Sequence, residues 1–187
     1  MNRLFAGRAV LWALFFLCDC TGRHNDPAAS DVAALSRPAG DFIVKVAEEH
    51  MASAELGRYA SGQASDWRLR TYGWHMLAFH RAALQRVRFI ATARDIRLND
   101  TMGEGYRRLV DSLKQKAGNP FDSTFMSVMA EREKMMIGDY DRAIQKIPDP
   151  QIKAFAAAER DSLLQHLVRI TAIRDSINVK KKRWAAP

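Results

Sequence analysis

The sequence predicts an all-α protein built as a four-helix bundle. Apolar residues recur every three or four positions along four long segments after residue 41, the spacing that places them on one face of a helix. No stretch of useful length alternates apolar and polar residues as a strand would. The 187 residues are enough for one domain with a core. Their 48% hydrophobic and 27% charged content is typical of a globular chain.

The first twenty residues differ from the rest and predict an export signal. Two arginines precede nine apolar residues, AVLWALFFL, a run that is too short to span a bilayer. The only cysteines, Cys18 and Cys20, follow this run directly, so no disulfide framework is expected in the folded part. We interpret residues 1–20 as a signal peptide in which Cys18 or Cys20 is a candidate for bacterial lipoprotein-type lipidation. The expected location is the periplasm or the outer membrane, with plain secretion as the alternative.

Residues 21–40 are small and polar and include two prolines, so they are expected to form a flexible tether. Four long helices follow. Ser65 and Asp66 precede the second helix and are residue types that cap helix N-termini. The sequence IPDPQ interrupts the chain before the last helix, and Pro150 falls in its first turn, where proline is tolerated. We expect helices over residues 41–61, 65–96, 121–147 and 150–177, in a bundle domain of residues 41–177 that is followed by a basic tail of residues 178–187.

A long connection joins the second and third helices and carries a short helix of its own. The stretch NDTMGEGYRRLVDSLKQKAGN has helical spacing, Gly118 and Asn119 end it, and Pro120 prevents its continuation. A connection of this length can cross the end of the bundle, as in ferritin-like bundles with one long crossover. The predicted fold is therefore a ferritin-like four-helix bundle with a long crossover connection.

Polar residues interrupt the apolar stripe of every long helix. Burial of an ionisable side chain costs free energy unless the group is paired or bound to a metal, so these groups are expected to meet inside the bundle. His75 does not belong with them, because it lies five residues from His80, about 140° around a helix. The interrupting residues are Glu49 and Ser53 on the first helix, His80 on the second, Glu133 on the third, and Glu159 and His166 on the fourth.

His80, Glu133 and His166 form the candidate metal site. Imidazole and carboxylate groups suit iron, manganese or zinc, and a helical bundle can present them to one ion. The alternative is a buried polar network in which the two histidines hydrogen-bond to Glu133 and Glu159 and fix the register of the helices. A di-metal centre is not expected, because such bundles use Glu-x-x-His pairs and this chain has none.

The net charge of +8 favours anionic partners. The second helix carries six arginines against only Asp66 and Asp95, and the tail contains KKKRW. Such surfaces are usually only solvated, but they also suit an anionic membrane surface or an envelope polysaccharide. Because the chain is expected to be exported, we do not expect nucleic acid as a partner.

Four stretches share an order and spacing with a known family: DFIVKVAEEHMASAELGRYA, HMLAFHRAAL, GNPFDSTFMSVMAEREKMM and DPQIKAFAAAERDSLLQHLVRI. Over residues 41–173 the chain resembles a bacterial exported family known as domain of unknown function number 4142. The resemblance implies a ferritin-like bundle and export, and it implies no established activity. His80 and His166 match histidines of the family, whereas Phe79 replaces an acidic residue, Glu133 a histidine and Ser53 a glutamate.

No reaction is predicted for this chain. The expected folded part has no cysteine, and we find no Gly-rich phosphate loop and no Ser–His–Asp arrangement. We expect an exported cell-envelope protein that acts as a non-catalytic binding or interaction module. The alternative is a metal-binding or oxidative-stress protein that uses His80, Glu133 and His166.

Overall fold

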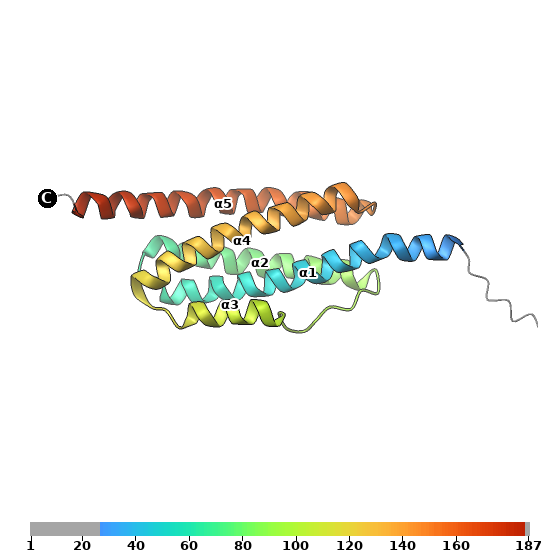
Figure 1. Ribbon diagram of the computed structural model, residues 1–187, viewed down its shortest axis with the longest axis horizontal. Helices are drawn as coiled ribbons and strands as arrows, with labels where there is room; N and C mark the ends of the chain where they lie inside the picture. The colour runs from blue at the N-terminus through green and yellow to red at the C-terminus, as the bar shows by residue number, and fades with distance from the viewer. Residues whose placement is uncertain (1–26, 186–187) are drawn as a thin grey trace, which may run out of the picture.

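The computed structural model describes residues 27–185, with side chains described for residues 37–178. Cys18, Cys20 and the expected signal peptide therefore lie outside the described residues. Within the described part the chain is all-α, as predicted, with no strand. The helices are α1 (Pro27–Gln63), α2 (Trp67–Thr92), α3 (Glu104–Lys114), α4 (Gly118–Lys146) and α5 (Pro150–Ala185), as Figure 1 shows.

The long helices pair as two hairpins. A three-residue turn joins α1 to α2 and another joins α4 to α5, and the two helices of each pair run back along one another (Figure 1). The short helix α3 lies in the connection between the hairpins, where the sequence predicted one, and packs beside α1. Tyr59 on α1 donates a hydrogen bond to the carbonyl of Lys114 at the end of α3, at 2.8 Å. None of the helices among the described residues has an apolar stretch long enough to cross a bilayer.

Four helix ends differ by more than two residues from the sequence-based expectation. Helix α4 begins at Gly118 rather than near residue 121, so Gly118 and Asn119 lie in its first turn, and the short helix that they were expected to end stops at Lys114. Helix α1 begins at Pro27 rather than near residue 41, so part of the expected tether is helical. Pro27 occupies a position where its missing N–H costs no hydrogen bond, and four alanines between residues 28 and 34 favour helix strongly enough for α1 to continue through Pro38. Helix α5 likewise continues to Ala185, through residues expected to form a tail, because Lys, Arg and Ala are good helix formers.

Helix α2 ends at Thr92, four residues before its expected end. Asp95 adopts a left-handed conformation with φ of 53°, and the N–H of Ile96 donates to the carbonyl of Ala91 at 2.9 Å. This is the Schellman arrangement, which glycine usually completes. Because aspartate takes the place of glycine here, the sequence carried no clear stop signal. At the other end Asp66 caps the helix by accepting from the N–H of Arg68, as expected.

A buried carboxylate on α4 holds the turn of the first hairpin. Asp122 on α4 is 5% exposed and accepts hydrogen bonds from the backbone N–H groups of Ser65 and Asp66, at 2.9 and 3.0 Å. These two N–H groups belong to the turn between α1 and α2. The start of α4 is therefore fixed against the end of the first hairpin.

The buried apolar residues form two clusters with a polar layer between them. The first cluster includes Ile43, Tyr140 and Leu163, and the second includes Leu56 and Phe125. Along every long helix, the buried members of the two clusters are separated by a gap that contains at least one histidine or glutamate, and one such residue from each gap belongs to the polar layer. These residues are His50 on α1, His80 on α2, Glu133 on α4 and His166 on α5. The tertiary structure therefore places the polar interruptions of the four stripes at one level of the bundle.

Candidate metal centre

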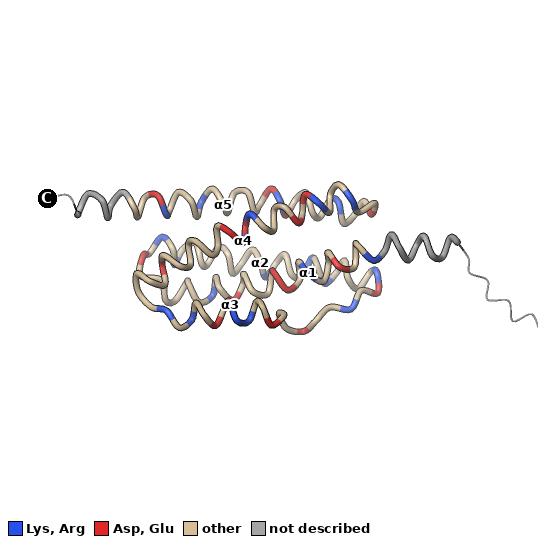
Figure 2. Tube along the Cα trace, in the orientation of Figure 1, with Lys and Arg blue, Asp and Glu red and all other residues tan. Residues whose placement is uncertain are grey.

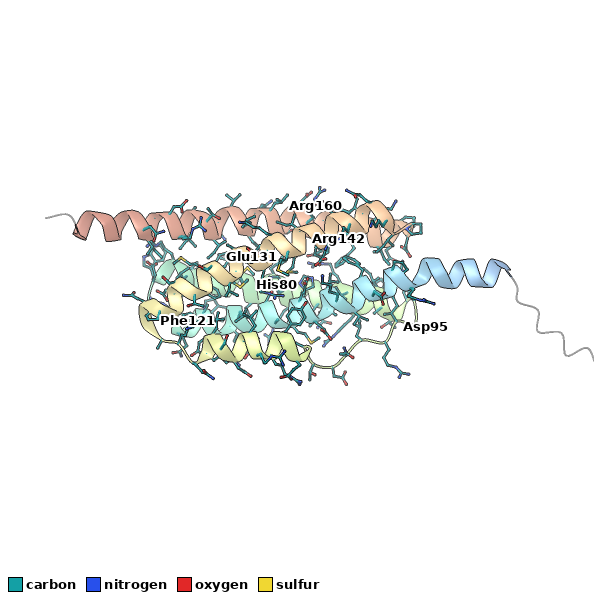
Figure 3. The ribbon with its side chains drawn as sticks, viewed as in Figure 1. His80, Asp95, Phe121, Glu131, Arg142 and Arg160 are labelled. Carbon is teal, nitrogen blue, oxygen red and sulfur yellow. The ribbon has the colours of Figure 1, made fainter. Side chains whose placement is uncertain are left out.

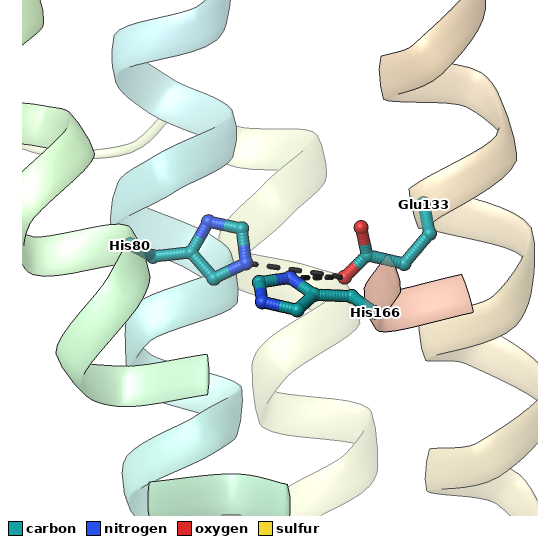
Figure 4. Close-up of side chains that lie close together, drawn as sticks. All are labelled: His80, Glu133 and His166. Carbon is teal, nitrogen blue, oxygen red and sulfur yellow. Dashed lines mark ion pairs between the residues drawn. The ribbon is translucent and has the colours of Figure 1, made fainter. Parts of the chain in front are cut away.

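Three side chains from three helices converge in this polar layer. His80 comes from α2, Glu133 from α4 and His166 from α5, and they point toward one another (Figure 4). His80 lies inside the bundle (Figure 3), with a side chain that is 0% exposed, and that of Glu133 is 1% exposed. The expectation that both residues face inward is confirmed.

The facing atoms of these residues are close, but they do not hydrogen-bond. Glu133 Oε1 lies 4.0 Å from His80 Nε2 and 3.8 Å from His166 Nδ1, and the three ligand atoms all lie within 4.8 Å of one another. Hydrogen bonds of this type are about 2.7–3.2 Å long. None of these three atoms has a hydrogen-bond partner among the described residues, and neither does Glu133 Oε2. Buried polar atoms without partners are uncommon, so this cluster of them requires an explanation.

Burial sets the protonation of the three groups. It lowers the pKa of His80 well below the usual value and that of His166 to about 4. It raises the pKa of Glu133 to about 8, against the opposing effect of the guanidinium of Arg132. Both imidazoles are therefore neutral at neutral pH, and neutral imidazole is the form that offers a lone pair to a metal.

His50 also belongs to this layer, and the sequence analysis missed it. Its side chain is fully buried, its Nδ1 lies 2.8 Å from Nδ1 of His80, and its Nε2 lies 2.8 Å from the hydroxyl of Tyr140. Burial lowers the pKa of His50 to about 3, and Arg86 acts in the same direction. The signal was present, because His50 is three residues before Ser53, which interrupts the predicted stripe of this helix, and four residues after the apolar Val46.

Phe79 forms an apolar wall beside the histidines. Its ring meets that of His166 edge-on, with centroids 4.5 Å apart, and that of His80 with centroids 5.0 Å apart. The side chain of His166 is 15% exposed, whereas His80 and Glu133 are shielded from solvent. The layer is therefore closed on most sides and reaches solvent at His166.

The remaining polar residues of the stripes lie elsewhere. Glu159 is 2% exposed but pairs with Arg86 Nε at 2.7 Å, so the predicted hydrogen bonds from the histidines to Glu133 and Glu159 are not formed. The predicted partners were wrong, because the guanidinium of Arg86 reaches Glu159 from α2 and Glu133 lies beyond hydrogen-bond distance of both histidines. His80 does join a buried polar network, through His50. Glu49 accepts a hydrogen bond from the Tyr106 hydroxyl at 3.2 Å, and burial raises its pKa.

The structure also shows where Ser53 and His75 lie. Ser53 is fully buried, and its hydroxyl has no partner among the described side chains. His75 is exposed and does not join His80, as its angular position predicted, although, in addition to burial, its charge helps to lower the pKa of His166. The structure thus brings together His80, Glu133 and His166, adds His50 behind His80, and assigns Glu49 and Glu159 to other partners.

The chain matches a known protein family. A family model described as Domain of unknown function (DUF4142) matches residues 24–173. No curated protein and no solved structure matches the chain.

Proposed function

This chain belongs to the DUF4142 family, whose description assigns no activity. We propose that it binds one divalent transition-metal ion through His80, Glu133 and His166. The candidate ions are iron, manganese and zinc. The observation that carries the proposal is the convergence of three buried ligand atoms that have no other partner among the described residues. An ion would satisfy all three atoms at once, which removes the cost of burying them unpaired.

The spacing of the ligand atoms is compatible with one ion. Metal bonds to histidine nitrogen and carboxylate oxygen are about 2.0–2.2 Å long, so two ligands of one ion stand between about 3.4 Å (tetrahedral) and 4.2 Å (opposite) apart. The separations of 4.0 and 3.8 Å from Glu133 Oε1 fall within this range. Small side-chain rotations would bring the two imidazoles to the same distance.

The donor set also suits the proposed ions. Two neutral imidazoles, together with the carboxylate that Glu133 offers once an ion displaces its proton, are borderline and hard ligands that bind zinc, iron and manganese. Three protein ligands leave a position that water or another small molecule can take. Of the three residues, only His166 is partly exposed, so it marks the side of the layer that lies nearest to solvent.

Elemental analysis and calorimetric titration test the proposal directly. The full chain, purified without a histidine tag and stripped with a chelator, is titrated separately with Zn²⁺, Mn²⁺ and anaerobic Fe²⁺. We expect about one ion per chain for at least one of these metals, and loss of that binding in His80→Ala, Glu133→Gln and His166→Ala. The matched control is His75→Ala, which removes an exposed histidine of the same helix and should leave binding unchanged.

Thermal unfolding separates loss of the site from loss of the fold. A ligand that binds only the native state raises the unfolding temperature, and the rise grows with the logarithm of the ligand concentration above the dissociation constant. Metal should therefore stabilise the wild-type chain and His75→Ala but not the three ligand variants. These variants should still unfold cooperatively in chelator, which would show that their fold is intact. No binding of any of the three metals, or binding that persists in all ligand variants, would overturn the proposal.

The proposal also includes the ferritin-like fold type, export and lipidation, which the sequence predicted. Two hairpins with a short helix in their connection support a ferritin-like bundle as the fold type. The charged and apolar pattern of the first twenty residues supports export, with lipidation at Cys18 or Cys20. Cell fractionation and mass spectrometry of the mature N-terminus test these features. A cytoplasmic chain that retains Met1 would contradict export, and a processed chain without lipid would leave secretion as the route.

A further inference from the structure

Helix α2 exposes three large aromatic side chains, whereas the described phenylalanines of the other helices are buried. Trp67, Trp74 and Phe89 are 65%, 63% and 67% exposed, whereas Tyr72 of the same helix is 1% exposed. Exposure of one aromatic residue needs no explanation, but three along one helix make a surface with an apolar component.

The same helix carries positive charge without any negative charge. Residues 67–92 include five arginines and no aspartate or glutamate. The other four helices all carry acidic positions, several of which Figure 2 shows in red. Within the part of the chain that the structure describes, Arg68 pairs with Asp66 and Arg86 with Glu159.

Two of these arginines are free to meet an external partner. Arg70 donates to the carbonyls of Ala64 and Ser65, at 2.8 and 2.9 Å, and so caps the preceding turn. Arg81 and Arg88 are exposed and have no ion pair or hydrogen bond with any described residue. Their guanidinium groups therefore keep all their donors available to a ligand from outside.

The exposed aromatic residues and the free arginines share one face of α2. Trp67, Trp74, Arg81 and Arg88 follow each other at intervals of seven, and each interval turns the position by only about 20° around the helix. With Phe89 they fall within an arc of about 100°, and they extend over roughly 33 Å along the axis. We call these five residues the outer face of α2.

We propose that the outer face of α2 binds an anionic lipid surface. Tryptophan rings favour the headgroup level of a bilayer, where their apolar body and polar N–H are both accommodated. Guanidinium groups form paired hydrogen bonds with phosphate. The outer face presents both groups along a single line, which is the composition of helices that lie in a membrane interface.

Lipid fits this face better than a second copy of the chain does. Two outer faces brought together would collect arginines from both copies with no carboxylate of either α2 to neutralise them. An anionic bilayer neutralises the arginines and also accepts the aromatic rings. The inference does not depend on the proposed metal site, because no residue of the outer face belongs to the set His80, Glu133 and His166.

Co-sedimentation with vesicles tests the inference. The full chain is mixed, in chelator, with vesicles of pure phosphatidylcholine or with vesicles that contain 30% phosphatidylglycerol. We expect binding to the anionic vesicles that is at least about tenfold stronger than to the neutral ones and that weakens strongly as salt rises. Equal binding to both compositions, or binding that is insensitive to salt, would overturn it.

Variants assign the binding to α2. The double variants Trp67→Ala/Trp74→Ala and Arg81→Gln/Arg88→Gln should each lose at least about tenfold in partitioning. The control Arg107→Gln/Arg108→Gln removes two arginines of α3 that pair with Glu104, and it should retain full binding. This control preserves both α2 and the basic C-terminal sequence. Unchanged binding by the two α2 variants would assign the contact to another part of the chain and overturn the inference.

Two further measurements identify other occupants. Analytical ultracentrifugation without vesicles detects self-association, and a dimer that the Trp67→Ala/Trp74→Ala variant abolishes would replace lipid with a second copy. A polyanion such as heparin that binds the wild type while anionic vesicles do not would likewise overturn the lipid assignment. The variant His80→Ala should bind vesicles normally, so failure of the metal proposal leaves this result unaffected.

Discussion

His50 Nδ1 lies 2.8 Å from His80 Nδ1, so one of these two nitrogens carries the proton that joins them. A metal can bind His80 Nε2 only when that nitrogen is unprotonated, so the proton of the neutral His80 ring must be on Nδ1. His80 then donates to His50, and the Nε2–H of His50 donates to the Tyr140 hydroxyl, 2.8 Å away. His50 is in this sense a positioning residue, because it selects the form of His80 that can bind a metal.

The variant His50→Leu removes the acceptor for His80 Nδ1–H and should weaken metal binding by about 10–100-fold. The variant His50→Gln keeps an acceptor oxygen and should lose less. Calorimetric titration measures both affinities, and unfolding temperatures in chelator show how much of each effect is loss of packing. Wild-type affinity in His50→Leu would show that the contact has no influence on the site.

Among the elements, the first hairpin depends on a close approach of two glycines. A Cβ placed on Gly73 of α2 would lie 2.7 Å from the carbonyl oxygen of Gly57 and from the N–H of Ser61, both backbone atoms of α1. A Cβ on Gly57 would be 2.8 Å from the backbone of α2. Only two residues without side chains allow the helices to pack this tightly, and this packing places His50 of α1 against His80 of α2.

The variant Gly73→Ala should therefore destabilise the fold, by roughly 1–3 kcal/mol, because the two backbones must separate. The control Gly40→Ala adds a Cβ in α1 where no atom lies within 4 Å, and it should stabilise the helix by about 0.5–1 kcal/mol. Urea unfolding measures both changes in the free energy of unfolding. A loss of the same size in both variants would contradict the close approach.

At the scale of the whole molecule, an ion pair ties the connecting helix to the first hairpin. Glu55 Oε1 on α1 lies 2.6 Å from Lys114 Nζ on α3 and 2.7 Å from an Arg58 nitrogen. The hydrogen bond from Arg58, with help from Lys114, lowers the pKa of Glu55 from 4.5 to about 2. This carboxylate therefore contributes stability that is fully present above about pH 4.5 and is lost as the pH falls toward 2.

The variant Glu55→Gln should lower the unfolding temperature at pH 7, and the difference from the wild type should shrink between pH 4.5 and pH 2. Thermal unfolding of both chains across this pH range measures the difference. The effect should be modest, because the pair is partly exposed and solvent screens it. If the difference in unfolding temperature stays constant over this pH range, its cause is not the charge of Glu55.

Much of the architecture could be read from local pattern. The stripes of α1, α2 and α4 are buried as predicted, and the short helix of the connection is where GEGYRRLV indicated it. Helix ends were less predictable, because an alanine-rich segment continued α1 through Pro38 and Asp95 closed α2 without a glycine. These helix ends depend on the sum of many small helix propensities. Start and stop residues considered one at a time do not give this sum.

The candidate site was predictable in part. Periodicity placed His80 and Glu133 inward, since a residue's face follows from its position along its own helix. It did not identify the partners of Glu159 or the contact between His50 and His80, which join residues 73 and 30 positions apart.

The sequence by itself thus determined the helices, the faces they bury and the polar residue types on those faces, all of which are properties of short segments. Only the tertiary structure decided that four of these polar residues occupy one layer and that Glu159 pairs with Arg86. The reason is that the meeting of side chains from different helices depends on the rotation and axial offset of each helix. Packing, including the close approach of Gly57 and Gly73, sets both quantities.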